Sequence, residues 1–261
     1  GSLTGHFSWM AMILPYVEQL PLHQQIDFNI TMADQPNEPL DATISADHPN
    51  AAAASTIVPV YLCPADGEDT NSVLVMGTAN AAPDSYAANA GWPSYATGYN
   101  GERSYPGEYN GLITLANMQP NVEVPWHPHR AIRVKDVTDG LSNTAAVSER
   151  LIMRGNNLDE IQAADNRMQS YHLPESARTL PQMIATSKLN PHSDPRLSAY
   201  QGRSWISGWT LTAPTYMHVF TPNTINMHLH DGVTSGDNLI TPSSYHSGGV
   251  NVAFADTHVL F

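Results

Sequence analysis

Closely spaced histidines are the residues of this 261-residue sequence with the clearest capacity for metal chemistry. His228 and His230 stand two positions apart, so on a β-strand both imidazoles share one face, as the ligands of a metal ion must. A transition-metal site needs a third ligand, which His246, Asp256 or His258 could supply if the chain end folds back near residue 230. The alternative interpretation places these groups on the surface or in turns, and we favour it.

His246 and Asp256 also have a structural interpretation. Their imidazole and carboxylate can tie the two ends of one strand to neighbouring loops. We favour this role over metal binding. The other close imidazole pair, His127-Pro128-His129, contains a proline that forces an extended loop, and it is interpreted as a surface feature.

Two groups of carboxylates suit the preference of calcium for oxygen ligands. Asp136 and Asp139 form one group, and Asp66, Glu68 and Asp69 form an acidic turn. Neither group has the spacing of an EF-hand loop. The alternative is that most of these carboxylates are solvated or cap turns.

No residue is assigned a catalytic role from the sequence. Cys63, the single cysteine, precedes Pro64 in an apolar stretch, which predicts a buried small hydrophobe rather than a nucleophile and excludes an intramolecular disulfide. The segment 202–205 lacks the second glycine of a nucleophile elbow, and zinc-helix, phosphate-loop and dinucleotide motifs are absent from the sequence.

An aromatic-rich stretch predicts a contact surface for a glycan or a protein. It lies in a long irregular excursion between Ser85 and Gly111, rich in Tyr, Asn, Gly and Pro, and continues beyond it. The alternative is that these rings pack a loop-rich core. The candidate surface residues are Trp92, Tyr95, Tyr99 and Trp126.

Composition restricts the classes of partner. The formal net charge is −13 and no run of Lys or Arg reaches three residues, so nucleic acid is excluded as a partner. No apolar window is long enough for a membrane helix. Gly1-Ser2 has the look of a cloning remnant, so we expect a native N-terminal segment to be missing.

Frequent prolines and glycines, 20 and 17 in number, predict short elements joined by loops. Near the start, an apolar stripe at helical spacing predicts helix, although Pro15 must kink it or begin a new piece, and Pro21 begins another. Residues 31–56 are expected to be loop with one helical turn. The stripe comprises Trp9, Met12, Ile13, Tyr16, Val17 and Leu20.

Later segments carry weaker signals for strand and helix. Residues 56–64 predict an edge strand or extended segment, and residues 134–140 a helical turn closed by glycine. Further expectations are a strand at 144–147 and helix-compatible patches at 158–168 and 180–187.

The chain ends in a predicted β-hairpin. Residues 250–254 alternate large apolar with small or polar side chains, which is typical of a half-buried strand. We expect a two-residue turn at Asp256-Thr257, although positive φ at the β-branched Thr257 costs roughly 1–2 kcal/mol. The expected pairs on one face are Phe254 with Val259 and Val252 with Phe261.

The stretch from His246 to Asp256, with Asp ten positions after His, resembles the C-terminal prepilin-processing-associated motif of a planctomycete pseudopilin-like family catalogued as a domain of unknown function. Shorter fragments match the same family in order from Trp9 onward, among them Leu62-Cys63-Pro64 and 136–144. The motif residues implied to be structural are His246, Gly248, Gly249, Asn251, Asp256, Asp139, Gly140 and Asn143.

This resemblance implies an α+β fold, type II pseudopilin-like, over one ectodomain at residues 1–261. An N-terminal helix, its membrane-anchoring half absent, would pack on an antiparallel sheet with long loops. Thr257 replaces the family's glycine, and Ile225-Asn226 stands where many members have Ser-Cys, which leaves Cys63 unpaired. The implied function is a non-enzymatic structural subunit of the cell envelope, associated with secretion or pili and partnered by similar subunits or envelope proteins.

Two other functions stay open at this point. One is a module that binds a surface polysaccharide or an envelope protein through the aromatic loops. The other is a metal-dependent enzyme that uses His228, His230 and His246. Bound Ca²⁺, which related pseudopilins often hold, or a transition metal would belong to the sets that include Asp136, Asp139 and Asp256.

Overall fold

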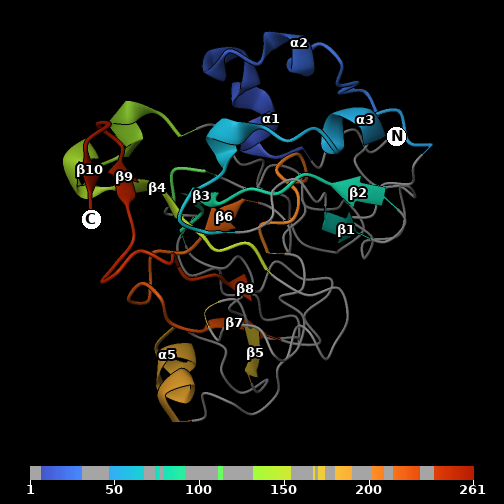
Figure 1. Cartoon of the computed structure of the whole chain (residues 1–261). Helices are drawn as coiled ribbons and strands as arrows, with labels where there is room; N and C mark the ends of the chain where they lie inside the picture. The colour runs from blue at the N-terminus through green and yellow to red at the C-terminus, as the bar shows by residue number, and fades with distance from the viewer. Residues whose placement is uncertain are drawn as a thin grey trace, which may run out of the picture.

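Short helices and small sheets make up the described part of this computed structural model, an α+β fold (Figure 1). The structure describes residues 7–30, 47–67, 74–76, 79–91, 111–113, 132–153, 167, 170–173, 180–189, 201–208, 214–229 and 238–261. The helices are α1 (Trp9–Ile13), η1 (Leu14–Val17), α2 (Leu20–His23), α3 (Ala51–Ala54), η2 (Pro59–Tyr61), η3 (Val134–Asp136), η4 (Leu141–Asn143) and α5 (Leu180–Leu189), η marking 3₁₀ helices. The strands are β1 (Leu74–Met76), β2 (Ala79–Ala81), β3 (Tyr86–Asn89), β4 (Ala145–Glu149), β5 (Ser170–Leu173), β6 (Thr215–Tyr216), β7 (Asn226–Leu229), β8 (Asn238–Leu239), β9 (Val252–Phe254) and β10 (Val259–Leu260).

The N-terminal helical pieces are as short as their prolines predict. Ser8 caps α1, because its hydroxyl accepts hydrogen bonds from the amides of Met10 and Ala11. Pro15 lies in the first turn of η1 and Pro21 in the first turn of α2, where a missing amide hydrogen costs nothing. The expected succession of short pieces is therefore confirmed.

The buried face of these pieces is not the predicted stripe. Met10 and Leu14 are fully buried, whereas Met12, Tyr16 and Leu20 are 50%, 86% and 49% exposed. Trp9, Ile13 and Val17 of the stripe are partly buried and pack against the core, so the stripe is only partly right. The difference begins within α1, where Met10 and Ala11 are buried and Met12 is exposed, so this helix turns a different face to the core from the one predicted. Because η1 has about three residues per turn instead of about 3.6, the side chains after residue 13 shift further.

The main core joins the N-terminal pieces to segments far along the chain. The Tyr61 hydroxyl donates to the carbonyl of Met10 at 2.8 Å, and the indole of Trp205 donates to the carbonyl of Thr56 at 3.0 Å. The buried cluster comprises Met10, Ala11, Leu14, Leu22, Ile26, Ala53, Ala54, Val58, Tyr61, Ala82, Trp205 and Ile206.

The central sheet has five strands in the order β10-β9-β4-β3-β6 (Figure 1). Its pairs are antiparallel except β3 with β6, where Ala88 lies beside Thr215 in parallel register. The sheet is therefore mixed, and differs in this strand pair from the antiparallel sheet that we expected. Two smaller sheets are described, β1-β2 and β5-β7-β8.

Other expected elements fare differently. The helical turn within 31–56 is α3, the strand at 144–147 is β4, and the patch at 180–187 is α5. Residues 56–64 do not form a strand, because Pro59 begins the 3₁₀ helix η2 between extended residues. Residues 158–166 lie outside the described residues, and within those that are described no helix is long and apolar enough to cross a membrane.

The register predicted for the C-terminal hairpin is wrong by one residue. Val259 pairs with Ala253, and the Phe254 amide donates to the carbonyl of His258 at 2.9 Å. The turn therefore has three residues, ending at Thr257 with φ 75°. A tight turn followed by a left-handed residue matches the twist of the strands, which explains why Thr257 tolerates its strained conformation.

The shifted register also changes which side chains are exposed. Phe254 stacks on the His258 ring with centroids 4.4 Å apart, instead of facing Val259. On β10 and beyond it, Val259, Leu260 and Phe261 are all more than half exposed, so the sheet ends in an apolar edge.

Candidate functional site

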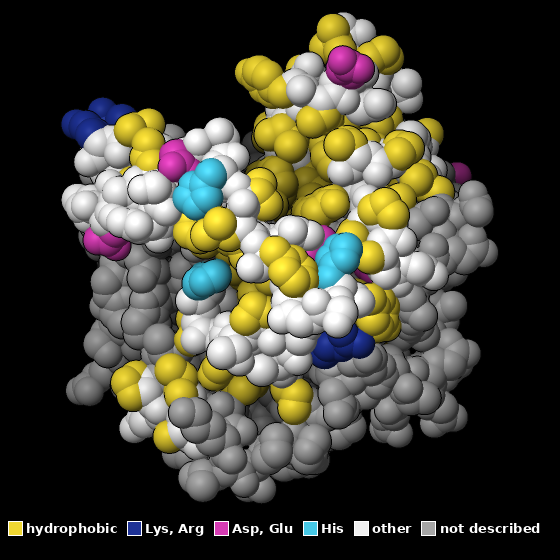
Figure 2. Space-filling view, turned by 60° about the vertical axis from the view of Figure 1, so that its left-hand side comes forward, with side chains coloured by type: hydrophobic (Ala, Val, Ile, Leu, Met, Phe, Trp, Pro, Cys, Tyr) yellow, Lys and Arg dark blue, Asp and Glu magenta, His cyan; other side chains and the backbone are white. Residues whose placement is uncertain are grey.

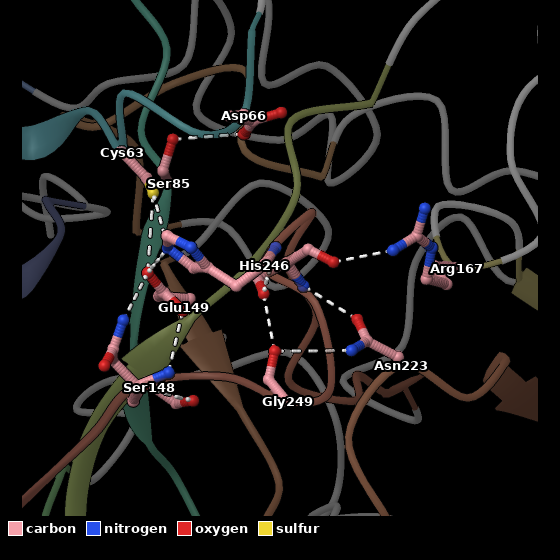
Figure 3. A network of polar contacts seen from close by, with 11 residues as sticks. Cys63, Asp66, Ser85, Ser148, Glu149, Arg167, Asn223, His246 and Gly249 are labelled. Carbon is pink, nitrogen blue, oxygen red and sulfur yellow. Dashed lines mark hydrogen bonds and ion pairs between the residues drawn. The ribbon is translucent and has the colours of Figure 1, made fainter. Parts of the chain in front are cut away.

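Three side chains able to bind a metal meet at the end of β4, the middle strand of the central sheet, and come from three separate segments (Figure 3). Cys63 follows η2, Glu149 ends β4, and His246 lies in the loop before β9. The Cys63 Sγ is 3.4 Å from Glu149 Oε1 and 3.5 Å from His246 Nε2. His246 Nε2 is 3.0 Å from the same carboxylate oxygen. We call these three residues the Cys-Glu-His cluster.

Glu149 is held in place by Asn251, the residue immediately before β9. The Asn251 amide donates to Oε2 at 2.7 Å, and the Asn251 side-chain amide donates to Oε1 at 3.1 Å. The Glu149 carbonyl also accepts from the Ser243 amide at 3.0 Å. These bonds fix the orientation of both carboxylate oxygens. The residue is almost fully buried.

His246 is positioned by the loop that carries it. Its amide donates to the Ser244 hydroxyl at 3.1 Å, and that hydroxyl donates to the Gly249 carbonyl at 2.7 Å. Asn223 accepts from the Ser244 amide at 2.8 Å (Figure 3). Gly248 has φ 100°, a conformation open to glycine but strained for other residues, so it permits the tight return of the chain.

A second buried polar group lies next to the cluster. Asp66 accepts hydrogen bonds from the Ser85 hydroxyl at 3.1 Å and from the Ile152 amide at 3.0 Å. Arg150 forms an ion pair with Asp84 at 2.9 Å, with both side chains fully buried. Burial raises the pKa of Asp84 to about 6, although the Arg150 charge and hydrogen bond lower it.

The Cys63 thiol is a poor nucleophile in this setting. Burial raises its pKa, and the charge of Glu149 raises it further, against a lowering by backbone hydrogen bonds from Ala65 and Asp66. Moreover, Cys63 and Glu149 both contact the same ring nitrogen of His246. A nucleophilic triad needs the acid on one imidazole nitrogen and the nucleophile on the other, so the arrangement suits metal ligation better.

Of the predicted histidines and acids whose side chains the structure describes, His246 alone is in the cluster. Asp256 pairs instead with His258 at 2.5 Å inside the hairpin turn, and this contact lowers the pKa of the Asp256 carboxyl. Asp136 accepts a hydrogen bond from the Arg133 amide at 3.0 Å. The carbonyl of Asp139 accepts from the side chain of Asn143, next to Gly140 with φ 90°.

The remaining predicted residues lie outside what the structure places. His228 is on β7 beside His172 of β5, but its side chain is not described. His230, Glu68 and Asp69 lie outside the described residues, as do the aromatic candidates Trp92, Tyr95, Tyr99 and Trp126.

Gly249, a motif residue that the structure does describe, packs close to the ring of Phe261, because an added Cβ there would lie 3.6 Å from that ring.

Two members of the cluster escaped the sequence analysis. Cys63 was interpreted as a small hydrophobe, and Glu149 was not singled out. A signal was present, because Glu149 and Arg150 lie between the apolar residues 145–147 and 151–153, and charged residues in such a setting are rarely buried unless paired.

A model of the protein family described as "Protein of unknown function (DUF1559)" matches residues 1–261, the whole chain. The chain belongs to that family. Membership agrees with the family of unknown function that the sequence motifs resemble. The family match does not extend to a relationship with pseudopilins. Comparison with curated proteins and with solved structures gave no match.

Proposed function

We propose that this member of the DUF1559 family is a non-enzymatic structural subunit of the cell envelope, of pseudopilin type and associated with secretion or pili. The observation that supports the proposal is the set of contacts that the C-terminal motif makes with β4. His246 and Asn251 both bind Glu149, and so fasten the C-terminal segment to β4. These contacts support a structural role for the motif.

The N-terminal pieces supply a surface for assembly. Met12, Tyr16 and Leu20 are exposed there, on the side opposite the buried Met10 and Leu14. Figure 2 shows hydrophobic side chains gathered at the top of the molecule, where Figure 1 places α1 and α2. Exposed apolar side chains in a group are typical of contact sites between proteins. We propose that a neighbouring copy of the same protein covers them.

Photo-crosslinking in cells tests this assembly. A crosslinking amino acid at Tyr16 is expected to give covalent homo-oligomers in the envelope fraction. The same amino acid at Val134, which is 71% exposed on η3, provides the matched control and is expected to give none. Crosslinks to unrelated proteins alone, or a protein found outside the envelope fraction, would contradict the proposal.

The gene provides an independent test of the pseudopilin relationship. We expect codons upstream of residue 1 to encode an apolar segment of about twenty residues, long enough to span a bilayer, behind a prepilin peptidase site. An upstream sequence without these two features would remove the pseudopilin part of the proposal, and would leave family membership untouched.

A further inference from the structure

The Cys-Glu-His cluster brings together a sulfur, an oxygen and a nitrogen ligand at the spacing of a metal site. Zinc bonds are about 2.3 Å to sulfur and about 2.0–2.1 Å to nitrogen or oxygen, so tetrahedral ligation separates sulfur from the other two atoms by about 3.6 Å. The observed separations from Cys63 Sγ are 3.4 Å and 3.5 Å. The edge from nitrogen to oxygen, 3.0 Å, would widen by about 0.4 Å.

Crowding at one oxygen points the same way. Glu149 Oε1 is approached by Cys63 Sγ, His246 Nε2 and the Asn251 side-chain amide. A carboxylate oxygen has about two lone pairs, so three donors cannot all be well satisfied. A cation bound to Oε1, the sulfur and the imidazole would replace the contacts of Cys63 and His246 with Oε1 by ligand bonds, and would leave Asn251 as the remaining donor.

The surroundings of the cluster have the features of a metal centre. Asn251 fixes the orientation of the carboxylate through both of its nitrogens, as residues around metal ligands commonly do. A divalent cation with a thiolate, a carboxylate and a neutral imidazole carries no net charge, which suits two ligands that are almost fully buried. The His246 side chain is 34% exposed, so a hydrated ion can reach it from solvent.

We propose that Cys63, Glu149 and His246 form a three-ligand site for Zn²⁺ or a similar borderline transition-metal ion, with the fourth position open to water. Calcium is disfavoured because it takes 6–8 oxygen ligands, whereas this set contributes one oxygen beside sulfur and nitrogen. The inference goes beyond the structural role proposed above and does not depend on it.

Alkylation of the single cysteine tests the site without any mutation. Untagged protein, stripped with a chelator, is treated with a thiol reagent in the presence of Zn²⁺, of Ca²⁺ or of neither. We expect Zn²⁺ to slow modification of Cys63 by more than about tenfold, because the metal-bound sulfur is shielded, and Ca²⁺ to have no effect. An unchanged rate with Zn²⁺ would overturn the proposal.

Calorimetric titration with Zn²⁺ and absorption spectra with Co²⁺ then identify the ligands. The wild-type chain is expected to bind one ion and to show a thiolate-to-cobalt charge-transfer band. Cys63→Ser and Glu149→Gln should weaken binding by more than about 100-fold, since loss of a residue behind the ligands already costs about 10–100-fold. Cys63→Ser should also abolish the band.

His258→Asn is the matched control, because this imidazole also contacts a carboxylate but lies in the exposed hairpin turn. It should change the affinity by less than about twofold. Circular dichroism of each stripped variant checks that it folds. Binding that survives Cys63→Ser, or that is lost equally in His258→Asn, would overturn the site, and neither result would bear on the crosslinking that tests the envelope role.

Discussion

Asp84 and Arg150 form a buried ion pair, and the carboxyl of Asp84 makes the free energy of unfolding depend on pH. Both side chains are inaccessible to solvent, and Asp84 Oδ2 has no hydrogen-bond partner among the described residues. Taking a carboxylate out of water costs several kcal/mol, and one arginine contact offsets only part of that cost. The charged form of Asp84 is therefore expected to oppose folding.

We predict that this carboxyl lowers stability as pH rises. Its pKa is about 6 in the folded chain against 3.8 for the free side chain, so the folded state binds more protons between these values. The free energy of unfolding contributed by Asp84 should be fully present below about pH 4 and fall by about 3 kcal/mol by pH 7. Urea unfolding followed by circular dichroism between pH 4 and pH 8 measures it.

Other carboxylates also titrate, so variants isolate the effect. Asp84→Asn should remove the fall, because asparagine imitates the neutral carboxyl, so the stability of this variant relative to wild type should rise by about 3 kcal/mol from pH 4 to pH 7. Asp256→Asn, in the exposed turn, should keep the fall. If wild type instead gained stability relative to Asp84→Asn between pH 4 and pH 7, the predicted sign would be wrong.

Individual turns, as elements, depend on residues with unusual backbone conformations. Thr257 in the β9–β10 turn and Asn223 before β7 both have positive φ, 75° and 61°. They differ in what their side chains do. Asn223 accepts a hydrogen bond from the Ser244 amide, which belongs to the loop carrying His246. The same substitution should therefore have opposite effects at the two sites.

We predict that Thr257→Gly stabilises the chain by about 0.5–1 kcal/mol, because glycine removes a left-handed cost of roughly 1–2 kcal/mol and adds back some chain entropy. Asn223→Gly should destabilise it by about 1 kcal/mol through the lost hydrogen bond. Urea unfolding of both variants compares them directly. A destabilised Thr257→Gly would mean that its side chain makes an essential contact.

For the whole molecule, stability is concentrated where the N-terminal segment meets residues 54, 82 and 205–206. The Ser8 amide donates to Ile206, the Ala82 amide to Ala54 and the Trp205 amide to Ala82. These bonds surround the main core, and the bond from Ser8 joins segments almost 200 residues apart. The β9–β10 hairpin, by contrast, lies at the sheet edge with an exposed apolar strand.

We predict that hydrogen exchange separates these regions. The amides of Ser8, Ala82 and Trp205 should exchange only through global unfolding, and therefore at one common free energy. The Phe254 and Thr257 amides should exchange at least about 100-fold faster, through local opening of the hairpin. Equal protection of Thr257 and Trp205 would show that the hairpin unfolds only together with the core.

Local features were within reach of the sequence. Prolines 15 and 21 predicted where the helical pieces begin, and the alternation at 250–254 predicted a strand, because both signals depend on neighbouring residues alone. The phase of the buried stripe and the hairpin register were missed. Which face a helix as short as α1 buries depends on the distant segments that pack against it, and an extra turn residue shifts every side chain that follows, so local patterns reveal neither.

Motif order was enough to indicate the family of unknown function, and periodicity with the prolines was enough to indicate short helical pieces and strands. The meeting of Cys63, Glu149 and His246 was decided by tertiary structure, since β4 and the loop before β9 bring together residues 183 positions apart at the extremes. Sequence spacing points to close neighbours such as His228 and His230. Ligands that come from distant segments can be identified only when strand pairing fixes which segments lie side by side.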